Sequence, residues 1–137
     1  MPDRDYSHRD VVDKLGIKPG HLVAFDETAG PLDAALCARV LTQTGRDPAE
    51  DGAEVDVALV MVTAATDHRA VLAQWRPRLT SVGGIWLLSP KRGQPGYLDQ
   101  RLLIEAAYGT DLVDNKVCSV SETISAIRFV IRKQARR

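Results

Sequence analysis

The 137-residue sequence contains only two cysteines, Cys37 and Cys118, and neither belongs to a C-x-x-C pair. This usage favours a cytoplasmic protein in which both thiols stay reduced. Histidine, cysteine and carboxylate residues also show no metal-ligand spacing, so no metal is expected. The sequence therefore gives no support for a disulfide scaffold or a metalloprotein.

Long hydrophobic stretches are also missing. The longest apolar run, Val57 to Val62, is far shorter than the ~20 residues that span a bilayer. The first ten residues, "MPDRDYSHRD", are polar and lack the apolar core of a signal peptide. We therefore expect no contact with a membrane.

The formal net charge is zero, so bulk charge favours neither nucleic acid nor a lipid surface as a partner. The charges are nevertheless unevenly distributed. Residues 26–56 contain eight acidic and two basic side chains, and residues 128–137 contain five basic and no acidic ones. The basic end "RKQARR" is either a solvated terminus or a site for phosphates or an acidic partner. Nucleic acid binding is not expected from this tail alone.

Recognisable catalytic motifs are absent. The sequence has neither a phosphate-binding P-loop nor the nucleophile elbow of the serine hydrolases. The composition, with 45% hydrophobic and 26% charged residues, is that of an ordinary soluble globular protein. The sequence thus favours a protein that is not an enzyme, without excluding one.

The hydrophobic pattern predicts alternating strands and helices. A short helix near residues 11–15 precedes apolar runs of strand length at 21–25, 55–62 and 85–89, and amphipathic helices follow each of these runs. Segments 112–120 and 125–133 alternate in polarity, as in an antiparallel strand pair. This order predicts a single α/β domain over residues 1–137, with flexible ends at 1–10 and 133–137. The predicted fold is a three-layer Rossmann-like sandwich of about five strands, mostly parallel, with a C-terminal antiparallel hairpin.

Three segments, "YSHRDVVDKLGIKPG", "GGIWLLSPKR" and "DLVDNKVCSVSETISAIRFVIRK", resemble an uncharacterised family of small bacterial proteins, a domain of unknown function. The layout also resembles a truncated Rossmann-like S-adenosylmethionine methyltransferase. "LGIKPGHLVAF" is similar to the lead into the first strand of that family, and residues 55–91 are similar to its fourth strand, the following helix and its fifth strand. The closing hairpin resembles its last two strands.

The methyltransferase resemblance implies two features that this sequence lacks. That family places a glycine-rich segment after its first strand, where backbone amides approach the carboxylate of the methyl donor. The corresponding segment here is "FDETAG", with Gly30 as its only glycine. The family also places an acidic residue at the end of its second strand, but the linker before residue 55 is too short for that strand. We therefore expect no cofactor.

Ligands of open parallel sheets lie beyond the carboxyl ends of the strands. Lys91 and Arg92, in the stretch "SPKRGQPGYLDQ", are suited to holding a phosphate or carboxylate there, and Asp67 or His68 is a candidate base. The interpretation that remains open is a solvated loop whose cations balance nearby acidic groups. The candidate anion site comprises Lys91, Arg92, Asp26, Asp67, His68 and Ser89.

Two hypotheses for the function follow. The first is a non-catalytic module that binds a protein partner or regulates another molecule. The second is a small enzyme or sensor that binds an anionic small molecule through Lys91 and Arg92. Cys118 is a weaker candidate for thiol chemistry, because a reactive thiolate needs both exposure and nearby positive charge, which Lys116 is placed to supply.

Overall fold

The computed structural model describes residues 10–135 and contains one mixed five-stranded sheet. Across the sheet the strands follow the order β1 (Val23–Asp26), β2 (Val55–Met61), β3 (Leu79–Pro90), β5 (Ile124–Ile131) and β4 (Leu112–Ser119). The first three strands are parallel, and β5 is antiparallel to both of its neighbours. The predicted fold, a mostly parallel sheet with a C-terminal antiparallel hairpin, is confirmed.

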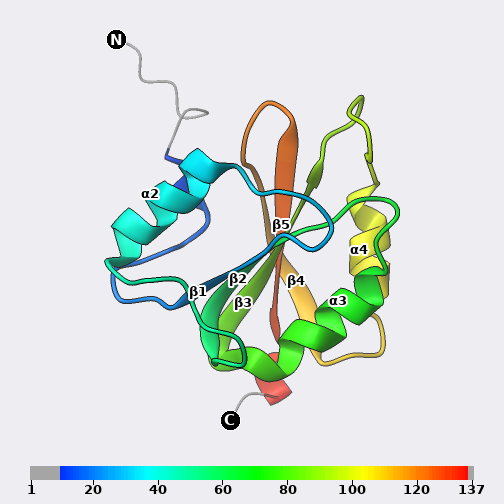
Figure 1. Ribbon diagram of the computed structural model, residues 1–137. Coiled ribbons are helices and arrows are strands. Elements are labelled where there is room, and N and C mark those ends of the chain that lie inside the picture. Colours follow the sequence, from blue (N-terminus) through cyan, green and yellow to red (C-terminus); the bar gives the residue numbers. More distant parts are fainter. Residues whose placement is uncertain (1–9, 136–137) are drawn as a thin grey trace.

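Helices cover both faces of the sheet and produce three layers (Figure 1). The first face carries α1 (Val11–Lys14) and α2 (Ala34–Thr44), and the second carries α3 (His68–Trp75) and α4 (Gln100–Ala106). Neighbouring residues of a strand project to opposite faces, and both faces of β2 and β3 are buried. Their nearly continuous apolar sequences are therefore those of central strands.

Aspartates begin the three longer helices at the carboxyl edge of the sheet. The carboxylates of Asp33, Asp67 and Asp99 accept hydrogen bonds from backbone amides of the first helical turn. Such caps satisfy amides that have no partner within the helix and typically contribute about 1 kcal/mol. The position of Asp67 is thus explained by the start of α3.

Strand β3 begins earlier than the predicted strand at 85–89. Its first half makes an irregular pairing with β2, in which Val55 pairs with Leu79 but Val57 pairs with Gly84. Gly83 lies in this irregular stretch, where an added Cβ would lie 2.9 Å from the carbonyl oxygen of Asp56. The polarity pattern does not show this close approach of two backbones.

Strand β4 contains a bulge that corrects one expectation from the alternating pattern. Asp114 pairs with Phe129 and Lys116 with Arg128, which leaves Asn115 as an extra residue. Because adjacent residues of β5 face opposite sides, Asp114 and Lys116 also lie on opposite faces. In a strand without a bulge, a spacing of two residues would place both side chains on the same face.

The predicted flexible ends lie mostly outside the described residues. Asp10 accepts a hydrogen bond from the backbone amide of Val12 and begins α1, and Lys133–Ala135 forms a short 3-10 helix. Between residues 10 and 135, no helix is both long and apolar enough to cross a membrane.

Candidate functional site

The segments that follow β1, β2 and β3 and the turn between β4 and β5 lie at one edge of the sheet, the carboxyl rim (Figure 1). This rim is the predicted location of a ligand site. Five of the six candidate residues belong to its loops or to the last residues of the strands that lead into them, and His68 is the first residue of α3. The structure does not, however, gather all six around one cavity.

Asp26 and Lys91 line different hollows, and Asp26 has a structural role. Its carboxylate accepts hydrogen bonds from the indole Nε1 of Trp75 at 2.9 Å and from the backbone amide of Thr28 at 3.0 Å. Burial alone would raise the pKa of Asp26, but the hydrogen bonds from Thr28 and Trp75 outweigh burial and hold the pKa below its ordinary value. Asp26 is therefore an ionised group that stabilises the junction between β1 and α3.

In the loop after β1, carboxylate side chains of the loop itself accept hydrogen bonds from nearby backbone amides. Glu27 Oε2 accepts a hydrogen bond from the amide of Leu32 at 2.7 Å, and Asp33 accepts one from the amide of Leu36 at 3.1 Å. Together with Asp26, these side chains give the loop three negative charges. The arrangement is the opposite of an anion-binding cradle, in which free amides face the ligand.

The loop after β2 is closed by internal hydrogen bonds. The backbone amide of Thr63 donates to Thr66 Oγ1 at 2.9 Å, and the ring of His68 bonds to the carbonyl oxygen of Thr63 through Nε2 at 2.8 Å. Asp67 caps α3 through the amide of Ala70 at 3.0 Å. His68 and Asp67 thus orient the loop and the helix, and the geometry assigns neither of them to a base at Lys91.

Lys91 and Arg92 line a hollow of about 230 Å³ beside the start of α4, which we call the rim hollow. The guanidinium of Arg92 lies 5.5 Å from the ring centroid of Tyr97, a cation–π contact that keeps it at the hollow. The ammonium of Lys91 donates to Ser119 Oγ at 2.6 Å. The remaining lining residues are Pro90, Leu98, Asp99, Gln100 and Ser125.

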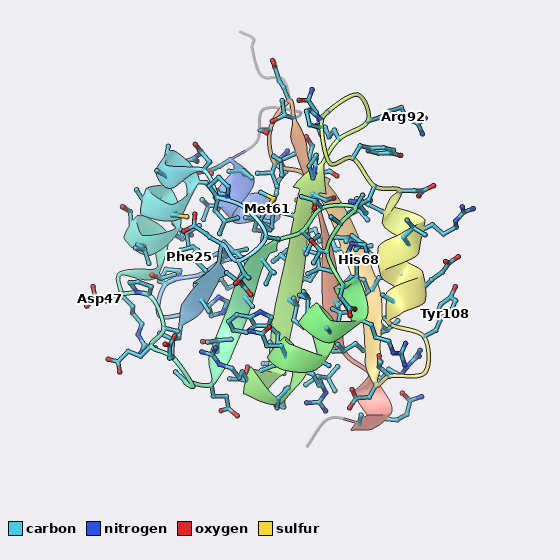
Figure 2. All side chains as sticks on the ribbon, turned by 45° about the vertical axis from the view of Figure 1, so that its right-hand side comes forward. Phe25, Asp47, Met61, His68, Arg92 and Tyr108 are labelled. Atoms are coloured by element: carbon cyan, nitrogen blue, oxygen red, sulfur yellow. The ribbon has the colours of Figure 1, made fainter. Side chains whose placement is uncertain are left out.

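Figure 2 shows Arg92 projecting outward from the loop after β3, whereas His68 lies at the beginning of α3. Ser89 is fully buried beneath the loop of Lys91 and does not line the rim hollow. Of the six candidates, the structure therefore brings Lys91 and Arg92 to one hollow, places Ser89 close to it, and leaves Asp26, Asp67 and His68 elsewhere.

Sequence reasoning missed three residues of the rim hollow: Tyr97, Gln100 and Ser125. Gln100 Nε2 donates to Ser125 Oγ at 3.1 Å, which links α4 to β5. The alternation of residues 125–133 indicates the face on which Ser125 lies. Only the antiparallel register with β3 brings Ser125 beside Ser89, and composition contains no signal for that register.

The two thiols show no activation. Burial raises the pKa of Cys118, and the nearby ammonium groups of Lys14 and Lys116 only partly offset this effect. Burial, together with Glu27 and Asp33, raises the pKa of Cys37. Both thiols are therefore predominantly protonated near neutral pH. Within the described part of the chain, no group of His, Cys, Asp or Glu has the arrangement of a metal site.

A family model described as a protein of unknown function, DUF3052, matches residues 12–133. The chain belongs to this family. A comparison of its sequence with curated proteins finds no match.

Solved structures of methyltransferases share the fold of this DUF3052 domain. A putative methyltransferase from Thermoplasma acidophilum is similar over 89% of this chain and 72% of its own, with a TM-score of 0.61 and 8% identity. A putative type 11 methyltransferase from Sulfolobus solfataricus gives a TM-score of 0.51 with 14% identity, over 85% of this chain and 73% of its own. TrmN from Thermus thermophilus gives 0.53 with 15% identity over 88% of this chain, which spans only 47% of TrmN. At such low identities, the similarity establishes a methyltransferase-like fold and gives no information about activity.

The methyl donor that such a fold implies does not fit the residues present. The loop that would meet the donor's carboxylate already carries the carboxylates of Asp26, Glu27 and Asp33, and like charges repel. Strand β1 is also the edge of the sheet, so the strand that would supply an acid for the ribose is absent from the described residues.

Proposed function

We propose that this DUF3052 domain is a non-catalytic module that binds a partner or regulates another molecule on a methyltransferase-like fold. The loop after β1 carries the proposal, because the amides of Thr28 and Leu32 already donate to the carboxylates of Asp26 and Glu27. Cysteine usage supports a cytoplasmic location for the module.

Isothermal titration calorimetry with S-adenosylmethionine and S-adenosylhomocysteine tests the absence of donor binding, with a methyltransferase of the same fold as the positive control. We expect no measurable heat for this chain and no thermal shift. A donor at 100 times its dissociation constant would stabilise the protein by about 2.7 kcal/mol, which a thermal scan detects readily. Micromolar binding of either compound would overturn the proposal.

Site-specific photo-crosslinking in the native host tests partner binding. One photoreactive residue replaces Arg92 at the carboxyl rim, and a matched one replaces Lys18, an exposed residue in the segment that leads into the opposite end of β1. We expect a discrete crosslinked product from position 92 and none from position 18. Absence of a product from position 92, or equal products from both positions, would contradict a partner that docks at the rim.

A second function, a sensor of an anionic small molecule, is favoured by the rim hollow. Lys91 and Arg92 line it, and neither forms an ion pair with another residue between 10 and 135. Two cations that line a hollow, without an ion-pair partner among the described residues, are suited to an anion that comes from solution.

A further inference from the structure

Three serines lie side by side across the sheet next to the rim hollow. Ser89 of β3 pairs with Ser125 of β5, and Ser125 pairs in turn with Ser119 of β4. Directly paired residues project to the same face, so the side chains form a row on the face covered by α3 and α4. Neighbouring strands are about 4.8 Å apart, so this serine row extends over roughly 10 Å.

Within the described residues, the hydroxyl of Ser125 accepts a hydrogen bond at the rim hollow but donates none. Ser125 Oγ accepts from Gln100 Nε2 at 3.1 Å, so its oxygen is engaged while its own proton stays available for donation. At the β4 end, Ser119 Oγ accepts from Lys91 Nζ at 2.6 Å and donates to the carbonyl oxygen of Ser121 at 3.2 Å. The row therefore presents a donor at Ser125 with an ammonium group beside it.

Ser89 forms the buried end of the row. Its side chain is 1% exposed, and Ser89 Oγ has no hydrogen-bond partner within the described residues. Buried hydroxyl groups in native proteins almost always have a partner, so an unpaired one calls for an explanation. The oxygen of its direct neighbour Ser125 can accept a second hydrogen bond. Once the Ser125 hydroxyl donates its own proton to a ligand, the hydroxyl of Ser89 can donate to Ser125 Oγ.

The size and charge of the rim hollow indicate what Ser125 would bind. Its volume of about 230 Å³ is below the roughly 300–1,000 Å³ typical of sites that enclose a whole organic ligand. It is sufficient for one charged group, with the rest of the ligand beside the ring of Tyr97. Lys91 and Arg92 face a single lining carboxylate, Asp99, which already accepts from the amide of Arg101 at 2.9 Å. An excess of positive charge remains.

We propose that the rim hollow binds the phosphate group of a small phosphomonoester, and this inference rests on the second proposed function. Lys91 and Arg92 neutralise the phosphate, and the Ser125 hydroxyl donates to one of its oxygens. Ser89 is a positioning residue that donates to Ser125 Oγ and completes the row. A phosphomonoester carries a charge of about −1.5 to −2 and three terminal oxygens, which match two cations and an added hydroxyl donor better than a carboxylate does.

NMR titration of the full chain with phenyl phosphate tests the proposal, with inorganic phosphate, benzoate and phenol as separate arms. We expect phenyl phosphate to shift the backbone amides of residues 89–92, 97–100 and 125, with at least tenfold tighter binding than benzoate. Binding of inorganic phosphate at equal affinity would identify the free ion, instead of an ester, as the ligand and would overturn the ester assignment. Shifts that gather elsewhere would overturn the site itself. Equal binding of benzoate at the rim hollow would overturn the phosphate assignment and leave the second proposed function, a site for an anionic small molecule, standing.

Variants separate binding from folding. Ser125→Ala is expected to weaken phenyl phosphate binding about tenfold, and Ser89→Ala severalfold, whereas Ser81→Ala at the other end of β3 has no effect. Because Ser89 Oγ lacks a partner in the free protein, Ser89→Ala should leave the thermal midpoint unchanged or higher. A lower midpoint with unchanged affinity would mean a merely structural role and refute the positioning role.

The two proposals fail separately. Binding of S-adenosylmethionine would overturn the non-catalytic module without involving the serine row. Unchanged phenyl phosphate affinity in Ser125→Ala, with the fold intact by NMR, would overturn the phosphate site and leave the rim crosslinking experiment valid.

Discussion

The hydrogen bond between Asp26 and Trp75 offers the most direct test of how β1 is attached to α3. Asp26 is 9% exposed and Trp75 is 4% exposed, so neither group exchanges its partner freely for water. Asp26→Asn keeps the side-chain volume but removes the charge. The NH2 group of the new asparagine is a donor, and it then lies against another donor, either the indole Nε1 of Trp75 or the backbone amide of Thr28.

The expected cost follows from those two bonds. Hydrogen bonds to a charged group contribute about 1.5–3 kcal/mol, and a buried donor left unpaired costs about 1–3 kcal/mol. We therefore expect Asp26→Asn to lower the free energy of unfolding by about 2 kcal/mol. For a chain of 137 residues, this change lowers the thermal midpoint by about 7 °C.

Urea unfolding followed by the fluorescence of the buried Trp86 measures this change even when Trp75 is replaced. Trp75→Phe removes the other partner, and the double variant gives the coupling energy between the two side chains. We expect the double variant to cost at least about 1 kcal/mol less than the sum of the single variants. Strict additivity, or a neutral Asp26→Asn, would refute the structural role of this carboxylate.

The same pair predicts a pH dependence. The folded-state pKa of Asp26 lies below its ordinary value of 3.8, so its ionised form stabilises the fold fully above pH 3.8. This contribution is lost as the pH falls through the lower folded-state pKa. The difference in stability between wild type and Asp26→Asn should therefore shrink below pH 3.8. A difference that stays constant down to pH 2 would contradict the assignment.

Two further substitutions test the packing of β3 and the attachment of β4. Gly83→Ala should lower the free energy of unfolding in urea by about 1–3 kcal/mol, because its Cβ would lie 2.9–3.0 Å from two backbone carbonyl oxygens. Gly30→Ala is the control. Its Cβ would meet only Met61 Cγ at 3.4 Å, so this variant should be nearly neutral. Arg76→Lys keeps the charge but loses the paired hydrogen bonds to Asp111 at 2.6 and 2.8 Å, and it should cost about 0.5–1 kcal/mol because both side chains are partly exposed. Equal costs for the two glycine variants, or a neutral Arg76→Lys, would contradict these assignments.

The order of strands and helices could be read from the sequence because it depends on hydrophobic period. Residues 57–62 are continuously apolar, and this pattern is typical of a strand covered on both faces. Details that depend on backbone geometry could not be read in this way. The bulge at Asn115 places the residues before it on the opposite face of the sheet from the one that regular alternation would give. Gly83 lies where two backbones approach closely. Neither feature is visible in the pattern of polar and apolar residues.

The candidate site was predictable only as a location. Parallel topology places Asp26, Asp67 and Lys91 at one rim, but it does not specify the direction of their side chains. Asp26 bonds to Trp75, and Asp67 bonds to the amide of Ala70, because buried or helix-terminal donors nearby require partners. Lys91 has no such local demand and extends to Ser119. The residues available for a ligand are thus those whose side chains are not needed as hydrogen-bond partners by nearby backbone or buried groups.

The free edge of β1 is partly covered by the segment of the same chain that includes Ala49. An exposed edge strand invites pairing with other chains. Here the amide of Ala49 donates to the carbonyl oxygen of Val23 at 2.9 Å, and the guanidinium of Arg78 holds the covering segment through the carbonyl oxygens of Ala53 and Glu50. This segment is rich in acidic residues and is not a strand, which disfavours addition of another strand. Partner binding by strand addition is therefore disfavoured at β1. The carboxyl rim, where Lys91 and Arg92 have no ion-pair partner among residues 10–135, is the surface to test first.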